Sequence, residues 1–345
     1  MGSAPIQPRM RRIESTPPKS NASPKQRLPV AQRSLHPVTS SQQRRSIGLW
    51  DDSWFAAGSR SRSRPKYLLG PYQTELDWSR GGSHRMPTTT LECSRSELWQ
   101  SQGYLTGLEV FPESEIEDYR SRFDALEADQ GLGKAEIGLN NLHFTHEFVW
   151  RLSTHPPVLE AIRSVLGPDV LLLGNHFFCK YPSASRGDKF VAWHQDVTYW
   201  GLEPPQAVTA WLAIDDVDVD NGCMRVIPGS HRHGILTHGT SATAGNLLSI
   251  NQEIPEESFD SSQTVDLVLK AGQMSVHDGM LIHGSNPNRS NRRRCGLAIR
   301  FISTRVRQVR ANSLGRHYRP VLVCGRDEFG HFPRTPVPFR QAEGN

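Results

Sequence analysis

Between residues 170 and 303 the chain is a succession of short apolar segments rich in β-branched and aromatic residues. These segments occupy 170–181, 189–196, 207–215, 224–230, 264–270, 273–278, 280–283 and 295–303. Turn-forming stretches such as DVDVDNGC and LKAGQ separate them. Many short strands with turn signals between them are typical of antiparallel sandwiches and barrels. The pattern therefore predicts a mainly β core.

Two helices are predicted upstream of these strands, over 111–131 and 156–167. The first has apolar residues at spacings of three and four, which form one stripe on a helix: Ile116, Tyr119, Phe123 and Leu126. The second begins with two prolines and ends at a glycine, as helices commonly do. We therefore expect helices to flank the β core.

The first 85 residues have a different composition from the rest of the chain. They are rich in Ser, Pro and Arg, and they carry 15 basic against 5 acidic residues. The remaining residues carry 25 basic and 30 acidic side chains, so the net positive charge belongs to this tail and is poor evidence for nucleic-acid binding. We expect the tail to be disordered. A mitochondrial transit peptide and a true start at Met86 are the alternatives.

The cysteine content and the hydropathy limit the environment of the protein. Five cysteines occur without a CxxC motif or regular spacing, which argues against a disulfide framework and favours a reducing compartment. Apolar runs stay well short of 18 residues, so we expect no membrane span. These features predict a cytoplasmic protein, with mitochondrial targeting through the basic tail as the alternative, and they specify no oligomeric state.

The most informative motif is WHQD at 193–196, followed by a distant histidine. Side chains two apart on a strand share a face, so His194 and Asp196 can point at one metal ion. His283, at the end of the apolar segment MLIH, is well placed to add a third ligand. Two histidines and one carboxylate are the set that holds non-haem iron(II) and leaves positions open. Zinc suits the same ligands, and hydrogen-bonded core or surface residues are the remaining alternative.

The strand after His283 favours iron. Along 295–301, residues Leu297, Ile299 and Phe301 share one face, and the other face carries small residues between Arg294 and Arg300. We expect Gly296 and Ala298 to leave an open slot with the planar Arg294 cation at one end. Such a slot fits a dicarboxylate that guanidinium grips through two hydrogen bonds.

The stretch from Phe177 to Phe301 resembles the phytanoyl-CoA dioxygenase family of Fe(II)/2-oxoglutarate oxygenases. The matching motifs are WHQD, WLAIDDVDVDNGCMRVIPGSH and HGSNPNRSNRRR. The resemblance implies a double-stranded β-helix, a jelly-roll or cupin-like core, with Fe(II), 2-oxoglutarate and O2 as cofactor and co-substrates. It also implies an oxygenase domain over 91–310, followed by a C-terminal extension over 311–345.

Site residues carry over from the family onto matching positions. The implied iron ligands are His194, Asp196 and His283. Arg294, eleven positions after the distal histidine, would hold the side-chain carboxylate of 2-oxoglutarate, with Ser285 assisting. Trp211 and Thr209 lie where such enzymes line the co-substrate pocket, although Trp211 also fits an ordinary core position.

The resemblance also bears on the reaction. Family halogenases have Ala or Gly in place of the carboxylate ligand, so Asp196 predicts hydroxylation or another oxidation of a C–H bond with release of succinate and CO2. We expect a small or medium metabolite as substrate. The alternatives are an acyl-CoA hydroxylase of the same family and a non-catalytic protein that binds metal and 2-oxoglutarate.

Two further residues are left with open roles. His277, in SVHDG, is a rival metal ligand, but a hydrogen-bonded position in a strand is the favoured prediction for it. Lys180, near the end of a predicted strand, is either close to an anionic group or exposed.

Overall fold

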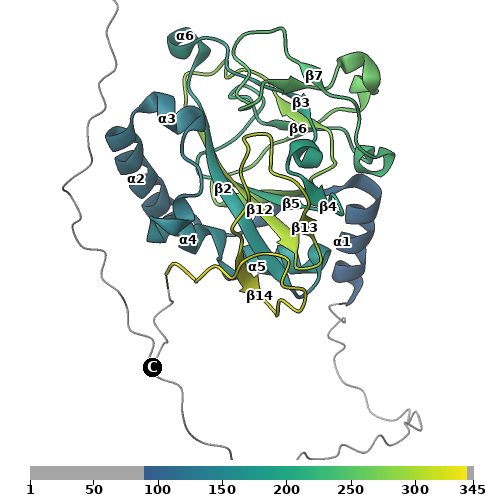
Figure 1. Cartoon of the computed structure of the whole chain (residues 1–345). Coiled ribbons are helices and arrows are strands. Elements are labelled where there is room, and N and C mark those ends of the chain that lie inside the picture. Colours follow the sequence, from purple (N-terminus) through teal and green to yellow (C-terminus); the bar gives the residue numbers. More distant parts are fainter. Residues whose placement is uncertain (1–88, 340–345) are drawn as a thin grey trace, which may run out of the picture. The chain divides into compact units, whose positions relative to one another are not determined.

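The computed structural model of the protein describes residues 89–339, so the predicted basic tail over 1–85 lies outside the described residues. Figure 1 shows the helices and strands of this part of the chain. The helices, in chain order, are α1 (Thr89–Gln102), α2 (Glu113–Gln130), α3 (Leu132–Ile137), α4 (Glu147–Ser153), α5 (Pro156–Leu166) and α6 (Ser183–Arg186).

Antiparallel sheets form the centre of the described chain. The larger sheet has six strands, in the order β1 (Tyr104–Glu109), β10 (Gln273–Asp278), β5 (Val208–Ala213), β12 (Arg294–Ser303), β2 (Val170–Lys180) and β14 (Val321–Cys324). The smaller has four, in the order β3 (Val191–His194), β11 (His283–Ser285), β6 (Met224–Val226) and β9 (Val265–Leu267). Two short pairs join β13 (Arg307–Gln308) to β4 (Leu202–Glu203) and β7 (Gly239–Thr240) to β8 (Gln252–Glu253). The predicted mainly β architecture is confirmed.

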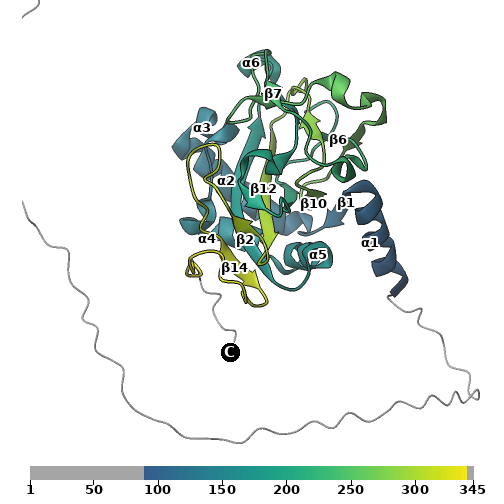
Figure 2. The same cartoon turned by 45° about the vertical axis from the view of Figure 1, so that its right-hand side comes forward.

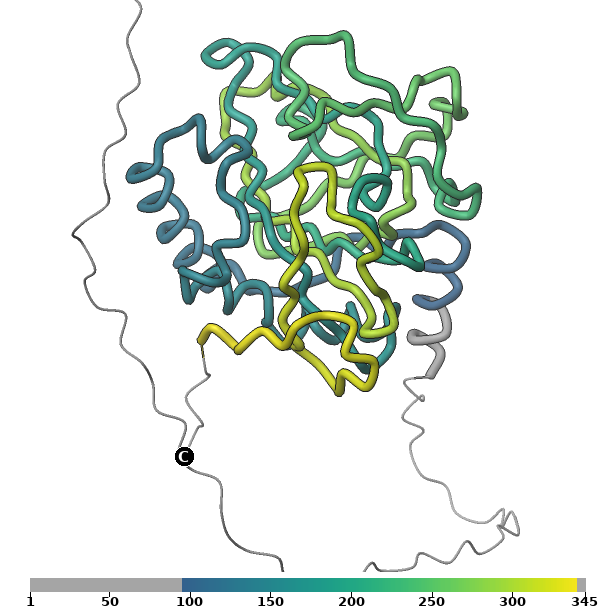
Figure 3. The backbone as a smooth tube through the Cα atoms, viewed as in Figure 1, coloured from purple at the N-terminus to yellow at the C-terminus, as the bar shows by residue number. Residues whose placement is uncertain are grey.

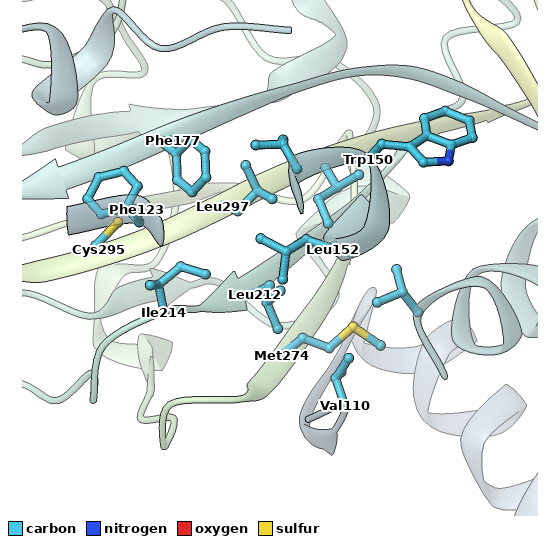
Figure 4. Close-up of a cluster of buried hydrophobic side chains, with 14 of the residues drawn as sticks. Val110, Phe123, Trp150, Leu152, Phe177, Leu212, Ile214, Met274, Cys295 and Leu297 are labelled. Atoms are coloured by element: carbon cyan, nitrogen blue, oxygen red, sulfur yellow. The ribbon is translucent and has the colours of Figure 1, made fainter. Parts of the chain in front are cut away.

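One face of the larger sheet packs against helices. In both views the helices α2 and α3 lie on one side of strands β2 and β12, and strand β6 lies on the opposite side (Figures 1 and 2). The predicted stripe of α2 supplies Ile116, Phe123 and Leu126 to the buried cluster, which Figure 4 shows in part. Phe123 meets Phe177 of β2 with ring centroids 4.8 Å apart. Burial of each such side chain stabilises the fold by about 1.5–3 kcal/mol.

Strand β12 shows why the two faces of this sheet differ. Leu297, Ile299 and Phe301 belong to the helix-side core, as the alternation predicts. Ala298 belongs instead to the cluster that includes strands of the smaller sheet. Because side chains alternate along a strand, the residues between the core positions face the smaller sheet. The functional side chains therefore have to be sought between the two sheets.

The chain after residue 310 contributes to the same sheet. Strand β14 pairs with β2, with Val321 opposite Leu172. Figure 3 shows this segment in yellow as it returns to the strands. Sequence reasoning gave residues 311–345 no secondary structure, because a four-residue strand at a sheet edge has too short a pattern to stand out.

Candidate metal and co-substrate site

His194, Asp196 and His283 converge although 89 positions separate the two histidines. In the pairing of β3 with β11, His283 lies directly opposite His194, and the ring centroids are 4.1 Å apart. One potential ligand atom from each of the three side chains lies within 4.8 Å of the others, and all three residues are buried. The predicted set is therefore brought together, and its role in metal binding remains a prediction.

The local backbone differs from the expected one at both ends of the motif. Strand β3 ends at His194, and Asp196 begins the 3-10 turn η2 (Asp196–Tyr199). Gln195 between them keeps an extended backbone, so His194 and Asp196 still share a side. His283 begins its strand instead of ending one, so the expectation that MLIH is a strand is wrong there. These differences leave the convergence unchanged.

The two histidines are oriented for a metal ion. Nδ1–H of His194 donates to the carbonyl of Ala192 at 2.9 Å, and Nδ1–H of His283 donates to that of Leu281 at 2.9 Å. A ring whose Nδ1 carries the proton has its lone pair on Nε2. Burial, with His194 nearby, holds the pKa of His283 well below its usual value, so the ring stays neutral. Two imidazoles and one carboxylate fit a divalent cation.

Asp196 is held from behind by its own contacts. Thr209 of β5 donates its hydroxyl to Oδ2 of Asp196 at 2.8 Å, which leaves Oδ1, 3.6 Å from Nε2 of His194, facing the two histidines. Burial alone would raise the pKa of Asp196, but interactions with His194 and His277 hold that pKa well below its usual range. Thr209 lines the pocket as expected, but it also orients the carboxylate, a role that sequence reasoning missed.

Thr209→Val removes this hydroxyl with little change in shape. We expect about 10-fold weaker metal binding, because partners that orient a metal ligand typically contribute about 10–100-fold. Titration of the purified protein with Co(II) measures this affinity. Thr198→Val is the matched control, because the Thr198 hydroxyl bonds the backbone carbonyl of Gln195 at 3.1 Å and does not contact the carboxylate. Equal affinities for both variants and the wild type would contradict the role of Thr209.

His277 does not have the role predicted for it. It lies fully buried on β10, and neither ring nitrogen has a hydrogen-bond partner in the described part of the chain. Its Nε2 is 3.7 Å from Oδ2 of Asp196, and its ring centroid is 4.5 Å from that of His283. The expectation of a hydrogen-bonded strand histidine is therefore wrong, because β10 places this side chain against the metal-site cluster.

Two buried basic residues lie opposite each other on neighbouring strands, and one of them, Arg294, lines the pocket. Arg294 is 3% exposed, and its guanidinium donates to the carbonyl of Gly222 at 2.8 and 3.1 Å and stacks on Trp211. Lys180 is fully buried directly opposite Arg294 in the pairing of β12 with β2, and its Nζ donates to Ser285 Oγ at 2.6 Å. Within residues 95–339 neither cation has a carboxylate partner in an ion pair. The hydrogen bonds of both groups go to uncharged partners, so an anionic ligand beside Arg294 would balance buried positive charge.

Lys180 decides a question that the sequence left open. Its burial excludes the exposed alternative, and burial together with the charge of Arg294 lowers its pKa well below the usual value. A bound anion would stabilise the charged ammonium. The sequence contains little indication of this position, because Lys180 lies opposite Arg294 only through the pairing of two strands that are far apart in the chain.

The slot expected above Gly296 is filled. A Cβ built on Gly296 would lie 2.0 Å from the ring of Trp211, so the small residue makes room for the indole. Trp211 packs with Ala298 in the core between the sheets and also lines the pocket. The prediction of an open slot over Gly296 is therefore wrong, and the remaining space lies beside the indole. The pocket is lined by both sheets, including Phe178, His194, Asp196, Thr209, Trp211, Met224, His283, Ser285, Arg294 and Arg300.

Comparison with known proteins now decides the family. The family model described as phytanoyl-CoA dioxygenase (PhyH) matches residues 99–296, more than half of the chain. This chain belongs to the phytanoyl-CoA dioxygenase family. Human peroxisomal phytanoyl-CoA dioxygenase is 21% identical over 240 residues, which cover 64% of this chain and 71% of the human protein.

Solved structures support the same assignment of the fold. The non-haem monooxygenase ThoJ in its apo form has a TM-score of 0.57 and 29% identity, and the match covers 70% of this chain and 86% of ThoJ. The epimerase SnoN, solved with Fe3+, alpha-ketoglutarate and nogalamycin RO, has a TM-score of 0.53 and 18% identity over 64% of this chain and 86% of its own. The predicted jelly-roll core is confirmed. Among the described helices none has the length and apolar character to cross a membrane.

Proposed function

We propose that this protein is an Fe(II)/2-oxoglutarate-dependent dioxygenase that hydroxylates a C–H bond of a small or medium metabolite. The observation that carries the proposal is the buried set of His194, Asp196 and His283 in a pocket that is also lined by the buried Arg294, with Lys180 opposite Arg294 in the strand pairing. In this proposal the three side chains hold the iron. Arg294, Lys180 and Ser285 hold the far carboxylate of 2-oxoglutarate, and residues 91–310 form the oxygenase domain.

The chain's own residues prepare the site for this chemistry. Bound iron(II) would activate O2, which takes two electrons from 2-oxoglutarate, giving succinate and CO2, and two from the substrate C–H bond. His194, Asp196 and His283 would hold the ion, and three protein ligands would leave coordination positions for the co-substrate. The hydroxyl of Thr209 keeps the Asp196 carboxylate turned toward the ion. Buried apolar walls such as Trp211 keep water from the pocket.

Asp196 supports hydroxylation over halogenation. In the family's halogenases Ala or Gly stands at this position, which leaves a coordination position open for halide. The carboxylate of Asp196 would fill that position. The fold alone is compatible with other oxidations, because SnoN is an epimerase. We expect turnover in the presence of chloride to give a product that gains oxygen and no chlorine, as measured by mass spectrometry; a chlorinated product would contradict the proposal.

The substrate class is proposed from the motifs around the site. The WHQD and GNHFFCKY segments are more typical of the biosynthetic branch of the family than of the acyl-CoA branch. Within 91–310 no basic cluster for coenzyme A stands out in the sequence, apart from arginines that already have roles. An acyl-CoA substrate is the alternative, as in the human relative that is named for phytanoyl-CoA.

Succinate release tests this function directly. The full-length protein, loaded with Fe(II) under nitrogen, is mixed with 2-oxoglutarate and then given air, alone and with a panel of metabolites and acyl-CoA thioesters. We expect a weak visible charge-transfer band with 2-oxoglutarate, slow succinate release without substrate, and faster release with the true substrate. A protein that purifies with zinc and is indifferent to oxygen would overturn the proposal. Binding of 2-oxoglutarate without any succinate would favour a non-catalytic role.

A further inference from the structure

Arg300 is a second arginine on the inner face of β12, six residues beyond Arg294. In the sheet register it lies opposite Thr209 of β5 and opposite Gly174 of β2. Thr209 is the residue whose hydroxyl holds Asp196, so Arg300 is one strand away from the carboxylate end of the metal site. Arg300 lines the pocket that contains His194, Asp196 and His283. Its position places a permanent cation beside the reacting centre.

The guanidinium of Arg300 has no partner for its hydrogen-bond donors. Its Nε is buried and unbonded, and in the described chain Arg300 makes no hydrogen bond and no ion pair. Its Cζ lies 5.4 Å from the ring centroid of Trp200, and its charge acts on Asp196, whose pKa it helps to lower. A buried polar group normally has a partner, and an unpaired buried charge is strongly unfavourable. The missing partner therefore has to be a ligand or bulk water.

Neighbouring arginines show what a structural role looks like in this protein. Arg293 pairs with Asp215 at 2.8 Å, and Arg307 pairs with Glu203 at 2.8 Å. Arg294 bonds a backbone carbonyl through two of its nitrogens. Among these four, Arg300 lines the cavity without an ion pair or a hydrogen bond within the described chain. A guanidinium that is flat against an aromatic ring and open at its edge is suited to grip a carboxylate or phosphate through two hydrogen bonds.

The cavity around Arg300 continues beyond the metal site. Besides His194 and Asp196, it is lined by His176, Tyr199, Trp200, Leu248 and Arg300. The His176 ring supplies no negative charge to Arg300, because its Nε2–H donates to the carbonyl of Ile137, and burial and the charge of Arg300 lower its pKa to about 3, so the ring is neutral. Asp196 is the one carboxylate that lines this cavity, and its two oxygens already face His194 and Thr209. An incoming molecule has to supply the anion.

We infer that Arg300 binds an anionic oxygen group, a carboxylate or a phosphate, of the molecule that occupies the site beside Asp196. This inference rests on the proposed function and deepens it, because it makes the primary substrate an anionic metabolite whose charged group lies at Arg300. The near carboxylate of 2-oxoglutarate offers the same chemistry from a second source. The far carboxylate already has Arg294 and Lys180 as partners, so Arg300 adds a separate anion position.

Anion binding by three versions of the full-length protein tests the inference. Wild type, Arg300→Gln and the control Arg307→Gln, which removes the same charge from the surface, are loaded with Ni(II) and saturating 2-oxoglutarate. Benzoate, phenyl phosphate and neutral benzamide serve as probes, and ligand-observed NMR gives their affinities. In wild type and Arg307→Gln we expect an anion to bind about 10-fold or more tighter than benzamide, as charge-assisted hydrogen bonds predict. In Arg300→Gln this preference should disappear.

Calorimetric titration with 2-oxoglutarate separates the two sources. If Arg300 holds a substrate anion, Arg300→Gln binds 2-oxoglutarate as wild type does and loses the probe preference. If it holds the near carboxylate of the co-substrate, 2-oxoglutarate binds about 10-fold more weakly and the probes show no preference in any version. The inference would be overturned if Arg300→Gln bound 2-oxoglutarate as tightly as wild type and, in addition, either wild type showed no preference for the anionic probes or Arg300→Gln kept the wild-type preference.

Thermal unfolding distinguishes a ligand site from a structural role. Because ligand-free Arg300 is half-buried, has an unbonded Nε and makes no ion pair in the described chain, we expect Arg300→Met to melt at the same or a higher temperature than wild type without ligands. A marked fall in melting temperature would identify Arg300 as structural and overturn the inference. Failure of wild type to bind 2-oxoglutarate at all would overturn the proposed function instead, and the probe titrations would then be repeated on the Ni(II)-loaded protein alone.

Discussion

Replacement of Asp196 by alanine is expected to reduce 2-oxoglutarate turnover by at least about 100-fold, because even residues that only orient metal ligands typically contribute about 10–100-fold. The variant loses the single negative charge among the three converging side chains. It should also bind Fe(II) more weakly. Succinate release under air and Fe(II) titration under nitrogen measure the two effects.

The control for this variant is Asp188→Ala. Asp188 pairs with Arg289 at 2.8 Å on the surface, and its side chain is half exposed. We expect wild-type turnover from this variant, since exposed ion pairs contribute about 0–1 kcal/mol to stability. Full succinate release by both Asp196→Ala and His194→Ala would eliminate the oxygenase assignment, because neither side chain would then be needed to hold the metal.

Replacement of Arg294 by leucine is expected to weaken 2-oxoglutarate binding by about 30-fold or more. The expectation follows from the cost of truncating one partner of a buried, hydrogen-bonded charge pair, about 2–5 kcal/mol. The measured quantities are the KM for 2-oxoglutarate in succinate release and the dissociation constant from calorimetry. Lys180→Met should weaken 2-oxoglutarate binding in the same direction, because Lys180 faces Arg294 across the strand pair.

Arg292→Leu is the matched control, two positions earlier in the same arginine run. Its guanidinium is half exposed and pairs with Asp218 at the surface. We expect it to leave the KM for 2-oxoglutarate unchanged. If Arg294→Leu and Lys180→Met both bind 2-oxoglutarate as tightly as wild type, the two buried cations hold something other than the co-substrate.

Local periodicity explains which parts of the fold were predictable. The stripe of Ile116, Phe123 and Leu126 and the alternation of Leu297 and Ile299 can be read from neighbouring residues, because burial on one face repeats with the period of the helix or the strand. The predicted positions of the strand ends were less accurate. His283 begins its strand and Asp196 lies just past its own, since the hydrophobic pattern continues through residues that the backbone does not pair.

By itself the sequence predicted which residues converge at the candidate metal site, and it proposed Arg294 as an anion anchor, because the spacing of His194, Asp196 and His283 and the residues around them form a specific combination. Only the tertiary structure decided what lies next to what. It buried Lys180 opposite Arg294, filled the space over Gly296 with Trp211, set Thr209 behind Asp196 and left Arg300 unpaired. Contacts of this kind depend on the register between strands far apart in the chain, and no local pattern encodes that register.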